Sequence, residues 1–243
     1  MNLSPELTPF LLVAAICFAG VVTQSIIGFG VALVCMPLLI QIFDPVSAAA
    51  LVALFVFPLQ LIIMWRYRRA LNIRPFWRVL VGVIVGTPIG VLLLERLDER
   101  VILSALGILL IAYALYSLLR PRLPEIRHPA WAYGCGLAAG MLGGAYNTGG
   151  PPVVIYGTSL GWSSEQFKAN LQALFMINSV LVIGAHVAAG HVTALVFENL
   201  LVALPVTVLG TLVGFWLSRR INEAAFRKAV LLLLIAVGVR LLL

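Results

Sequence analysis

The sequence predicts an all-α protein of many membrane-spanning helices, built as two repeats that insert in opposite directions. Its 243 residues are 62% hydrophobic and 10% charged, with a mean hydropathy of +1.10. A soluble domain is roughly 45–50% apolar and about 25% charged, so no soluble domain is left over. Apolar runs of about 20 residues, long enough to cross a bilayer, recur along the chain. One run in each half is interrupted by glycine, so we expect a single membrane transport domain over residues 1–243, with repeats at about 7–119 and 130–242.

In the first half, a broken helix pair is followed by three spans. The apolar run Leu7 to Ile27 ends at the interruption Gly28-Phe29-Gly30, after which the shorter run Val31 to Phe43 reaches Asp44-Pro45. This shorter segment either crosses the membrane fully or re-enters, and the pattern leaves both open. The three expected spans are Val46 to Trp65, Phe76 to Leu94 and Val101 to Leu119.

The second half repeats this order. The run Ala130 to Gly144 leads into the stretch Gly143 to Pro152, whose glycines and prolines do not continue a helix. Glycine costs about 1 kcal/mol and proline about 3 kcal/mol in a helix interior. The short run Val153 to Leu160 follows, and then a helix that is capped by Ser163 or Ser164 and runs to about Ala189. The last two expected spans are Thr193 to Leu217 and Ala224 to Leu242.

The charged residues predict opposite orientations for the two repeats. Arginines and lysines gather in loops 66–75 and 120–128 of the first half and between 219 and 228 in the second, and basic loops stay in the cytoplasm. The basic connections thus occupy different positions in the two halves, each shifted by one connection relative to the other. This shift is expected when two repeats insert in opposite directions. Both termini then face the periplasm. These loops also account for the formal charge of +7, so no nucleic-acid partner is expected.

The two interruptions are expected to form a binding site. Broken backbone inside a bilayer is tolerated only where protein or a polar cavity covers it. A helix that resumes after a break presents unpaired N–H groups and about half a positive charge, which suits an anion, and neutral side chains add donors. The alternative is a tight turn whose glycines serve packing alone. The candidate substrate-binding residues are Gln24, Ser25, Gly28, Phe29, Gly30, Tyr146, Asn147, Thr148, Gly149, Gly150, Lys168 and Gln172.

The placement of the ionisable residues favours an anionic substrate. The Asp and Glu residues lie at or near expected span ends, whereas carboxylates at span centres mark cation sites and proton relays. Lys168, about one turn into its helix, either snorkels to the interface or attracts an anion from inside. The three cysteines are isolated in apolar runs, without a CxxC pair, so no metal, cofactor or disulfide is expected.

The interrupted segments resemble the paired signatures of the TauE/SafE sulfite-exporter family. Gln24 to Pro37 is similar to the first signature, with Gly28-Phe29-Gly30 and Met36-Pro37-Leu38. Gly143 to Pro152, with the short apolar run and the Ser-rich helix start after it, is similar to the second. By position, the matching residues are Gly28, Gly30, Gly149, Gly150 and Pro151.

The resemblance covers nearly the whole chain and implies a bacterial inner-membrane carrier of small sulfur-containing anions. These would be sulfite, sulfonates such as sulfoacetate, or thiosulfate. The family usually has three glycines in a row at each break. Here Phe29 and Val31 stand in the first break and Asn147-Thr148 in the second, so the ligand itself stays open.

We therefore expect a carrier that exports a sulfite-like or organosulfonate anion by alternating access. A permease for thiosulfate or a carboxylate is the alternative, and a metal-cation carrier is disfavoured by the lack of central acidic residues. An intramembrane enzyme is disfavoured because Ser25 and His186 lack a catalytic frame. A membrane scaffold would not need polar residues at both breaks. Rows of small residues, such as Gly82, Gly86 and Gly90, indicate close helix packing and allow a homodimer without requiring one.

Overall fold

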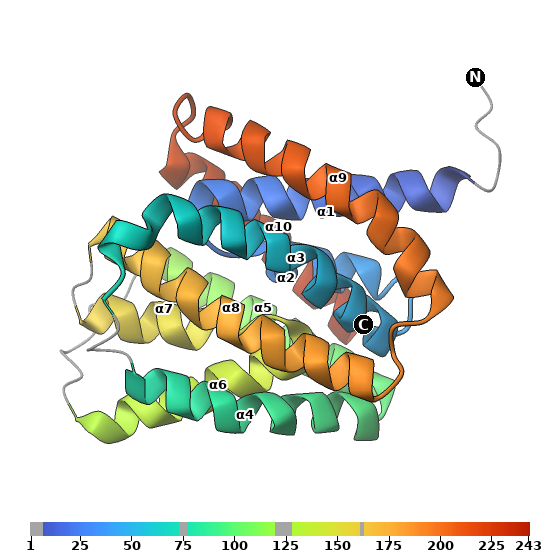
Figure 1. The fold of residues 1–243 in the computed structure, drawn as a ribbon, viewed down its shortest axis with the longest axis horizontal. Coiled ribbons are helices and arrows are strands. Elements are labelled where there is room, and N and C mark those ends of the chain that lie inside the picture. The colour runs from blue at the N-terminus through green and yellow to red at the C-terminus, as the bar shows by residue number, and fades with distance from the viewer. Residues whose placement is uncertain (1–6, 73–76, 120–127, 161–162) are drawn as a thin grey trace.

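The computed structural model describes residues 7–72, 77–119, 128–160 and 163–243, and within them every regular element is a helix. Figure 1 shows the long helices running side by side as a bundle, with α1 beginning and α10 ending toward the same end. The elements are α1 (Leu7–Ile27), α2 (Val31–Leu39), α3 (Pro45–Tyr67), the 3₁₀ helix η1 (Arg68–Ala70), α4 (Trp77–Arg96), α5 (Glu99–Leu119), α6 (Pro129–Tyr146), α7 (Gly150–Ser159), α8 (Ser164–Ala188), α9 (Ala194–Leu217) and α10 (Glu223–Leu242).

The helices occur in the predicted order, and the differences lie at the broken pairs. Helix α2 ends at Leu39, four residues before the predicted Phe43. Helix α6 continues to Tyr146, and α7 begins at Gly150, three residues before the predicted Val153. Prolines are tolerated in the first turn of a helix because the N–H they lack has no intrahelical partner there. The second break therefore contains only residues 147–149.

The two short helices are too short to cross a bilayer alone. Helix α2 has 9 residues and α7 has 10. At a rise of about 1.5 Å per residue they are about 14 and 15 Å long, whereas the hydrocarbon core is about 30 Å thick. Eight of the nine residues of α2 are buried in the protein. Each break is thus enclosed by the other helices rather than exposed to lipid.

Six helices of the described part of the chain are long and apolar enough to span a membrane: α1, α3, α4, α5, α8 and α9. The sequence predicts α6 and α10 as spans too, and both fall outside these six. Helix α6 has 18 residues and is rich in glycine. Helix α10 carries Arg227, Lys228 and Arg240 within its length. The predicted multi-span helical class is confirmed, while the basic loop 120–128 lies almost entirely outside the described residues.

The strongest helix contacts form four pairs. Helix α4 packs on α6, α1 on α9, α5 on α10, and α3 on α8. If α1–α5 correspond in order to α6–α10, then α1 corresponds to α6 and α4 to α9. Under this correspondence the α4–α6 pair becomes the α9–α1 pair, and the α5–α10 and α3–α8 pairs are unchanged. Helices α3, α7 and α9 end, and α4, α8 and α10 begin, toward the left-hand end of Figure 1, whereas α8 ends and α9 begins at the other.

Helices α4 and α6 touch through their backbones. A Cβ added at Gly90 would overlap the carbonyl of Met141, and one at Gly140 would lie 2.6 Å from the carbonyl oxygen of Val83. At the related α1–α9 pair, a Cβ at Gly214 would instead meet the side chain of Ser25, 2.5 Å from its Cβ. Small residues let membrane helices approach this closely. The two related pairs thus differ, one joined backbone to backbone and the other through side chains.

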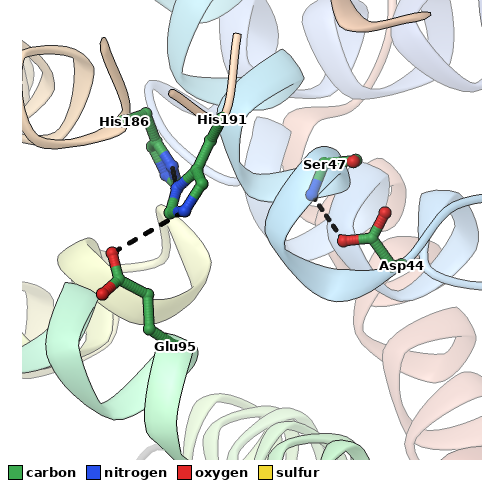
Figure 2. Close-up of polar contacts among 5 residues, drawn as sticks. All are labelled: Asp44, Ser47, Glu95, His186 and His191. Atoms are coloured by element: carbon green, nitrogen blue, oxygen red, sulfur yellow. Dashed lines mark hydrogen bonds and ion pairs between the residues drawn. The ribbon is translucent and has the colours of Figure 1, made fainter. Parts of the chain in front are cut away.

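Polar caps fix the helices that follow the short segments. The Asp44 carboxylate accepts a hydrogen bond of 2.9 Å from the backbone N–H of Ser47 and caps α3 (Figure 2). Partial burial alone would raise the pKa of this carboxyl group, but the hydrogen bonds from Ser47 outweigh it and hold the pKa below its ordinary value. Ser163 caps α8 in a reciprocal capping box with Gln166. Of the two predicted caps, Ser163 is the one that the structure uses.

Candidate functional site

The two breaks meet at one cavity, which we call the central cavity. The space in it that a water-sized sphere can reach is about 20 Å³, room for about one water molecule, so the cavity is nearly closed in this conformation. Residues of both halves line it, together with side chains of α3 and α8. The lining residues are Gln24, Phe29, Gly30, Val31, Ala32, Leu33, Val56, Gln60, Asn147, Thr148, Gly150, Pro151 and Phe175.

Two glycines and one glutamine determine the conformation of the first break. Gly28 and Gly30 have φ angles of 94° and 110°, a region that residues with a Cβ rarely adopt. The Oε1 atom of Gln24 accepts a hydrogen bond of 3.2 Å from the N–H of Val31, so a side chain of α1 caps α2 across the break. The Nε2 atom of Gln24 is buried and has no hydrogen-bond partner among the described residues. It therefore remains available as a donor at the cavity wall.

The start of α2 supplies further donors. The first N–H groups of an α-helix have no partner inside the helix. Gln24 takes the one of Val31, while no partner within the described chain takes those of Ala32 and Leu33, which both line the cavity. The helix dipole adds about half a positive charge at this end. The first break thus offers an anion a set of neutral donors.

The second break is built differently. Asn147 adopts a left-handed conformation with φ 54° and ends α6, while the N–H of Thr148 bonds back to the carbonyl of Leu142 at 3.2 Å. This is a common way to end a helix. The Nδ2 group of Asn147 donates a hydrogen bond of 2.9 Å to the carbonyl of Ala49 in α3. The side-chain donor of Asn147 is therefore used to join the two halves.

Helices α3 and α8 complete the cavity wall. Gln60 of α3 is 4% exposed, and its buried Oε1 atom has no hydrogen-bond partner among the described residues. Val56 lies one turn before it, and Phe175 of α8 contributes an aromatic face. A buried amide without a partner costs free energy unless a ligand or water satisfies it. Because Oε1 is an acceptor, it would be satisfied by water or by a ligand that carries a hydrogen-bond donor.

The wall of the central cavity carries no formal charge. None of its lining residues, all of which the structure describes, is Asp, Glu, Lys, Arg or His. A site for a metal cation normally supplies carboxylates, imidazoles or thiolates. Neutral amides and helix N–H groups bind an anion instead, and they do so without a fixed counter-charge that would hold it too tightly to leave.

Half of the twelve candidate residues line the central cavity: Gln24, Phe29, Gly30, Asn147, Thr148 and Gly150. The other six lie behind it and hold the breaks in place. The carbonyl of Gly28 accepts a hydrogen bond of 2.7 Å from the fully buried Gln172. The aliphatic stem of Lys168 packs on Gly28 as well, since a Cβ there would lie 2.9 Å from its Cγ. The Lys168 ammonium group lies 5.7 Å from the centre of the Tyr67 ring.

The remaining three of these six support other helices. The Tyr146 hydroxyl donates a hydrogen bond of 3.0 Å to the carbonyl of Ile102 in α5. Gly149 lies against α6, where a Cβ would approach the carbonyl oxygen of Ala139 to 2.5 Å. Ser25 is buried against Gly214 of α9, and its Oγ has no hydrogen-bond partner among the described residues. Their assignment to substrate stays a prediction.

Gln60 is only a weak candidate in the sequence, and Val56 and Phe175 are not candidates at all; all three come from unbroken helices. Gln60 carries the one usable signal, because it is a glutamine inside the apolar sequence of α3. Val56 and Phe175 carry none, since apolar residues fill every span. Only the packing of α3 against α8 tells which of their residues face the breaks.

A second polar cluster lies away from the cavity, at the end of α8. The Nδ1 atoms of His186 and His191 are 3.0 Å apart, and Nε2 of His191 lies 3.9 Å from the Glu95 carboxylate (Figure 2). None of the three lines the central cavity. Within the described residues, no group of three or more His, Cys, Asp or Glu has the arrangement of a metal site.

Comparison with known proteins identifies the family. The sequence pattern of the family "Sulfite exporter TauE/SafE" matches residues 12–241. The "probable inner membrane transporter protein TsaS" of Comamonas testosteroni is 32% identical over 177 residues, covering 71% of this chain and 73% of the relative. The "probable sulfite/organosulfonate exporter TauE" of Cupriavidus necator is 23% identical over 243 residues, covering 98% and 95%. No solved structure matches the chain.

Proposed function

The chain belongs to the TauE/SafE family of membrane transporters, and from this premise we propose that it exports a small sulfur-containing anion, either sulfite or an organosulfonate such as sulfoacetate. One observation carries the proposal. The two breaks, one from each half, enclose a single small cavity that offers uncharged hydrogen-bond donors. The relatives are named as transporters and exporters rather than enzymes.

The chemistry of the cavity supports an oxyanion. Such an anion presents several oxygen acceptors around one centre and needs donors from several directions. Gln24, Ala32 and Leu33 line the cavity from the first break with an unpaired Nε2 and two unpaired N–H groups, and Gly150 lines it from the second, its N–H without a partner among the described residues. A small carboxylate presents the same acceptors in a plane, so it is the alternative substrate class, together with thiosulfate. A metal cation would meet donors rather than ligands.

We propose that transport proceeds by alternating access between two inverted repeats. The packing supports this, because matching α1–α5 with α6–α10 exchanges the α4–α6 and α1–α9 pairs and preserves the α3–α8 and α5–α10 pairs. In transporters of this kind the substrate lies at the repeat interface, near the midplane, between broken helices. The central cavity occupies the corresponding place, with walls from both halves.

The orientation follows from the charges at the two ends of the bundle. Arg66, Arg68 and Arg69 lie at the end of α3, and the connection between α9 and α10 carries Arg219 and Arg220. Basic connections stay in the cytoplasm. We therefore propose that this end of the bundle is cytoplasmic and that both termini face the periplasm of an inner-membrane protein.

Thermal unfolding of the detergent-purified protein tests the substrate class. The scan compares sulfite, sulfoacetate, thiosulfate, sulfate, acetate and nickel. A ligand at about 100 times its dissociation constant stabilises the folded state by roughly 2.7 kcal/mol. We expect the unfolding temperature to rise with one sulfur oxyanion. A rise with acetate or nickel alone would contradict the proposed substrate.

Transport into liposomes tests the site. We expect Gln24→Ala and Asn147→Ala each to slow uptake of the anion that stabilises the protein, because each removes a group that shapes the cavity. Gln41→Ala is the matched control, since Gln41 follows α2 and bonds the carbonyl of Pro37 outside the cavity. Unchanged transport in both Gln24→Ala and Asn147→Ala would refute the site.

A further inference from the structure

A second cavity, which we call the side cavity, adjoins the central one. The space in it that a water-sized sphere can reach is about 10 Å³, so it is nearly closed, and it shares Phe29, Gly30 and Leu33 with the central cavity. On its far side it is lined by Tyr113 of α5 and Arg227 of α10. The start of α2 thus separates two spaces, one that holds the free donors described above and one that contains a permanent positive charge.

A third, wider hollow continues from the side cavity toward the end of the bundle, and we call it the entrance groove. The space in it that a water-sized sphere can reach is about 360 Å³, and it shares Arg227 and Leu231 with the side cavity. Ser117, near the end of α5, and the exposed Lys228, near the start of α10, line it too. The three hollows form one series, in which each neighbouring pair shares residues.

Arg227 stands where the entrance groove meets the side cavity. It lies about one turn into α10 and is half-buried, and it forms no ion pair with any residue that the structure describes. A guanidinium group keeps its charge at every physiological pH. A cleft lined by one sign of charge within low-dielectric walls raises the local concentration of ions of the opposite sign. Arg227 therefore favours anions at this position.

Phe29 is the side chain between the side cavity and the central cavity. It is 5% exposed and lines both, and its ring packs edge-on against Tyr113 at 5.9 Å and Phe167 at 6.5 Å between centroids. Its neighbours Gly28 and Gly30 both have positive φ angles. A phenylalanine held between two such glycines can be displaced without disturbing a regular helix.

From this series we infer a route for the anion: it enters between α5 and α10, is attracted by Arg227, and reaches the central cavity past Phe29, which acts as the barrier. The inference rests on the proposed function for the identity of the anion. Its physical content, an anion-selective path controlled by Arg227 and closed by Phe29, is independent of which anion is carried.

Thiol labelling in the full-length, detergent-purified protein tests the path without any substrate. Cys17, Cys35 and Cys135 are first replaced by alanine, and Val230→Cys places a thiol in the side cavity. Labelling rates are measured by mass spectrometry with two methanethiosulfonates, the anionic sulfonatoethyl and the cationic trimethylammonioethyl reagent. We expect the anionic reagent to react faster, and Arg227→Gln to lower the ratio of anionic to cationic rates about fivefold or more.

Two control variants separate the charge of Arg227 from other effects. Arg227→Lys keeps the charge and should keep most of the ratio. Lys228→Gln removes a neighbouring charge that lines the entrance groove alone, and should change the ratio less than Arg227→Gln does. Equal rates for the two reagents, or equal effects of Arg227→Gln and Lys228→Gln, would overturn the role of Arg227.

The barrier is tested at Val56→Cys, which places a thiol in the central cavity. We expect slow labelling by the anionic reagent with Phe29 in place, and labelling about tenfold faster or more in Phe29→Ala, since a buried aromatic ring leaves a space when truncated. Phe29→Leu, which keeps an apolar side chain, should lie between the two. Fast labelling of Val56→Cys with Phe29 intact, or no response to Phe29→Ala, would overturn the barrier.

The labelling result is independent of the proposed function. If no sulfur anion is bound or transported, the rates still decide whether the path exists. If sulfite is transported but the labelling ratio does not respond to Arg227→Gln, the proposed function stands and the route is wrong. If both hold, Arg227→Gln should raise the KM for transport with less effect on the maximal rate.

Discussion

The two breaks bring the same kind of helix start to one cavity, but they equip it differently. At the first, Gln24 caps α2 with one atom and keeps Nε2 free, and the N–H groups of Ala32 and Leu33 stay unpaired. At the second, Pro151 and Pro152 remove two N–H groups from the first turn of α7. The two halves share the order of their elements but differ at the cavity: most of the unpaired donors belong to the first break, and the second keeps only the N–H of Gly150 in the first turn of α7 beside its two prolines.

The nearest test of this difference is Gln24→Glu, for which we expect the largest effect. The carboxylate can still accept the N–H of Val31, and a negative charge is favourable at a helix start, so the protein should fold. A bound anion about 4 Å away would meet repulsion of about 4 kcal/mol at an effective dielectric constant of 20. Titration with sulfite, followed by the unfolding temperature, should show a loss of affinity of about 100-fold or more.

Gln41→Glu is the matched control for this change. It makes the same substitution after the other end of α2, at an exposed residue outside the cavity. It should leave sulfite affinity within about twofold of the parent, because charges far apart in water are screened. Equal losses in Gln24→Glu and Gln41→Glu would mean that the first break does not hold the anion.

Substitutions in the second break should lower the free energy of unfolding more than they lower the affinity for the anion. Asn147→Ala puts alanine, whose side chain cannot form hydrogen bonds, at a backbone φ of 54°. It also removes the hydrogen bond from the Asn147 side chain to the carbonyl of Ala49. The left-handed conformation and the lost bond together should cost about 1–3 kcal/mol of unfolding free energy. Asn147→Gly keeps the conformation and loses only the bond, so thermal unfolding should place it between the parent and Asn147→Ala. A larger loss in Asn147→Gly would contradict this account.

Pro151→Ala sharpens the comparison in the opposite direction. It returns an N–H group to the first turn of α7, at a residue that lines the central cavity. One added donor should tighten anion binding by about 1 kcal/mol, roughly fivefold, measured by the same titration. Pro152→Ala is the control, because Pro152 does not line the cavity. Tighter binding in Pro152→Ala alone would indicate that the second break holds the anion elsewhere.

The smallest expected effect concerns the helices that follow the short segments. The pKa of Asp44 is held below its ordinary value, so its contribution is fully present above the unfolded pKa of about 3.9 and is lost as the pH falls through the folded pKa. Asp44→Ala should cost about 0.5–1 kcal/mol near pH 7 and progressively less below about pH 4. The cost of Ser163→Ala should not change over this range, and thermal unfolding at several pH values measures both. A pH-independent cost for Asp44→Ala would contradict the role of its charge.

The sequence predicted the helices better than it predicted the site. Glycine and proline mark both breaks, and long apolar runs mark the spans, so their order follows from local properties of the chain. The joining of the breaks at one cavity was expected, but the roles of their residues were not. Ser25 and Gln172 look like ligand donors in the sequence, and in the structure one lies against α9 and the other bonds the backbone of Gly28.

Residues such as Phe175 and Arg227 could not be selected for a related reason. Each lies on a helix without a break, where the face that points inward is set by contacts with helices distant in the chain. Arg227 was counted among the basic residues that set the orientation, and its place beside a buried cavity depends on how α10 packs against α5. Tertiary packing, rather than local pattern, decides such roles.

The backbone contact between α4 and α6 has a consequence for motion. Three glycines of each helix fit against main-chain atoms of the other, as at Gly140 and Val83, so sliding or rotation of one helix past its partner would bring backbone atoms into collision. Packed interfaces of this kind have discrete arrangements and do not deform continuously. The pair should therefore travel as a single rigid body. A rearrangement that opens the cavity first to one side of the membrane and then to the other must therefore occur at looser contacts. The α1–α9 pair, which corresponds to α4–α6 in the other half and meets through side chains, is one such contact.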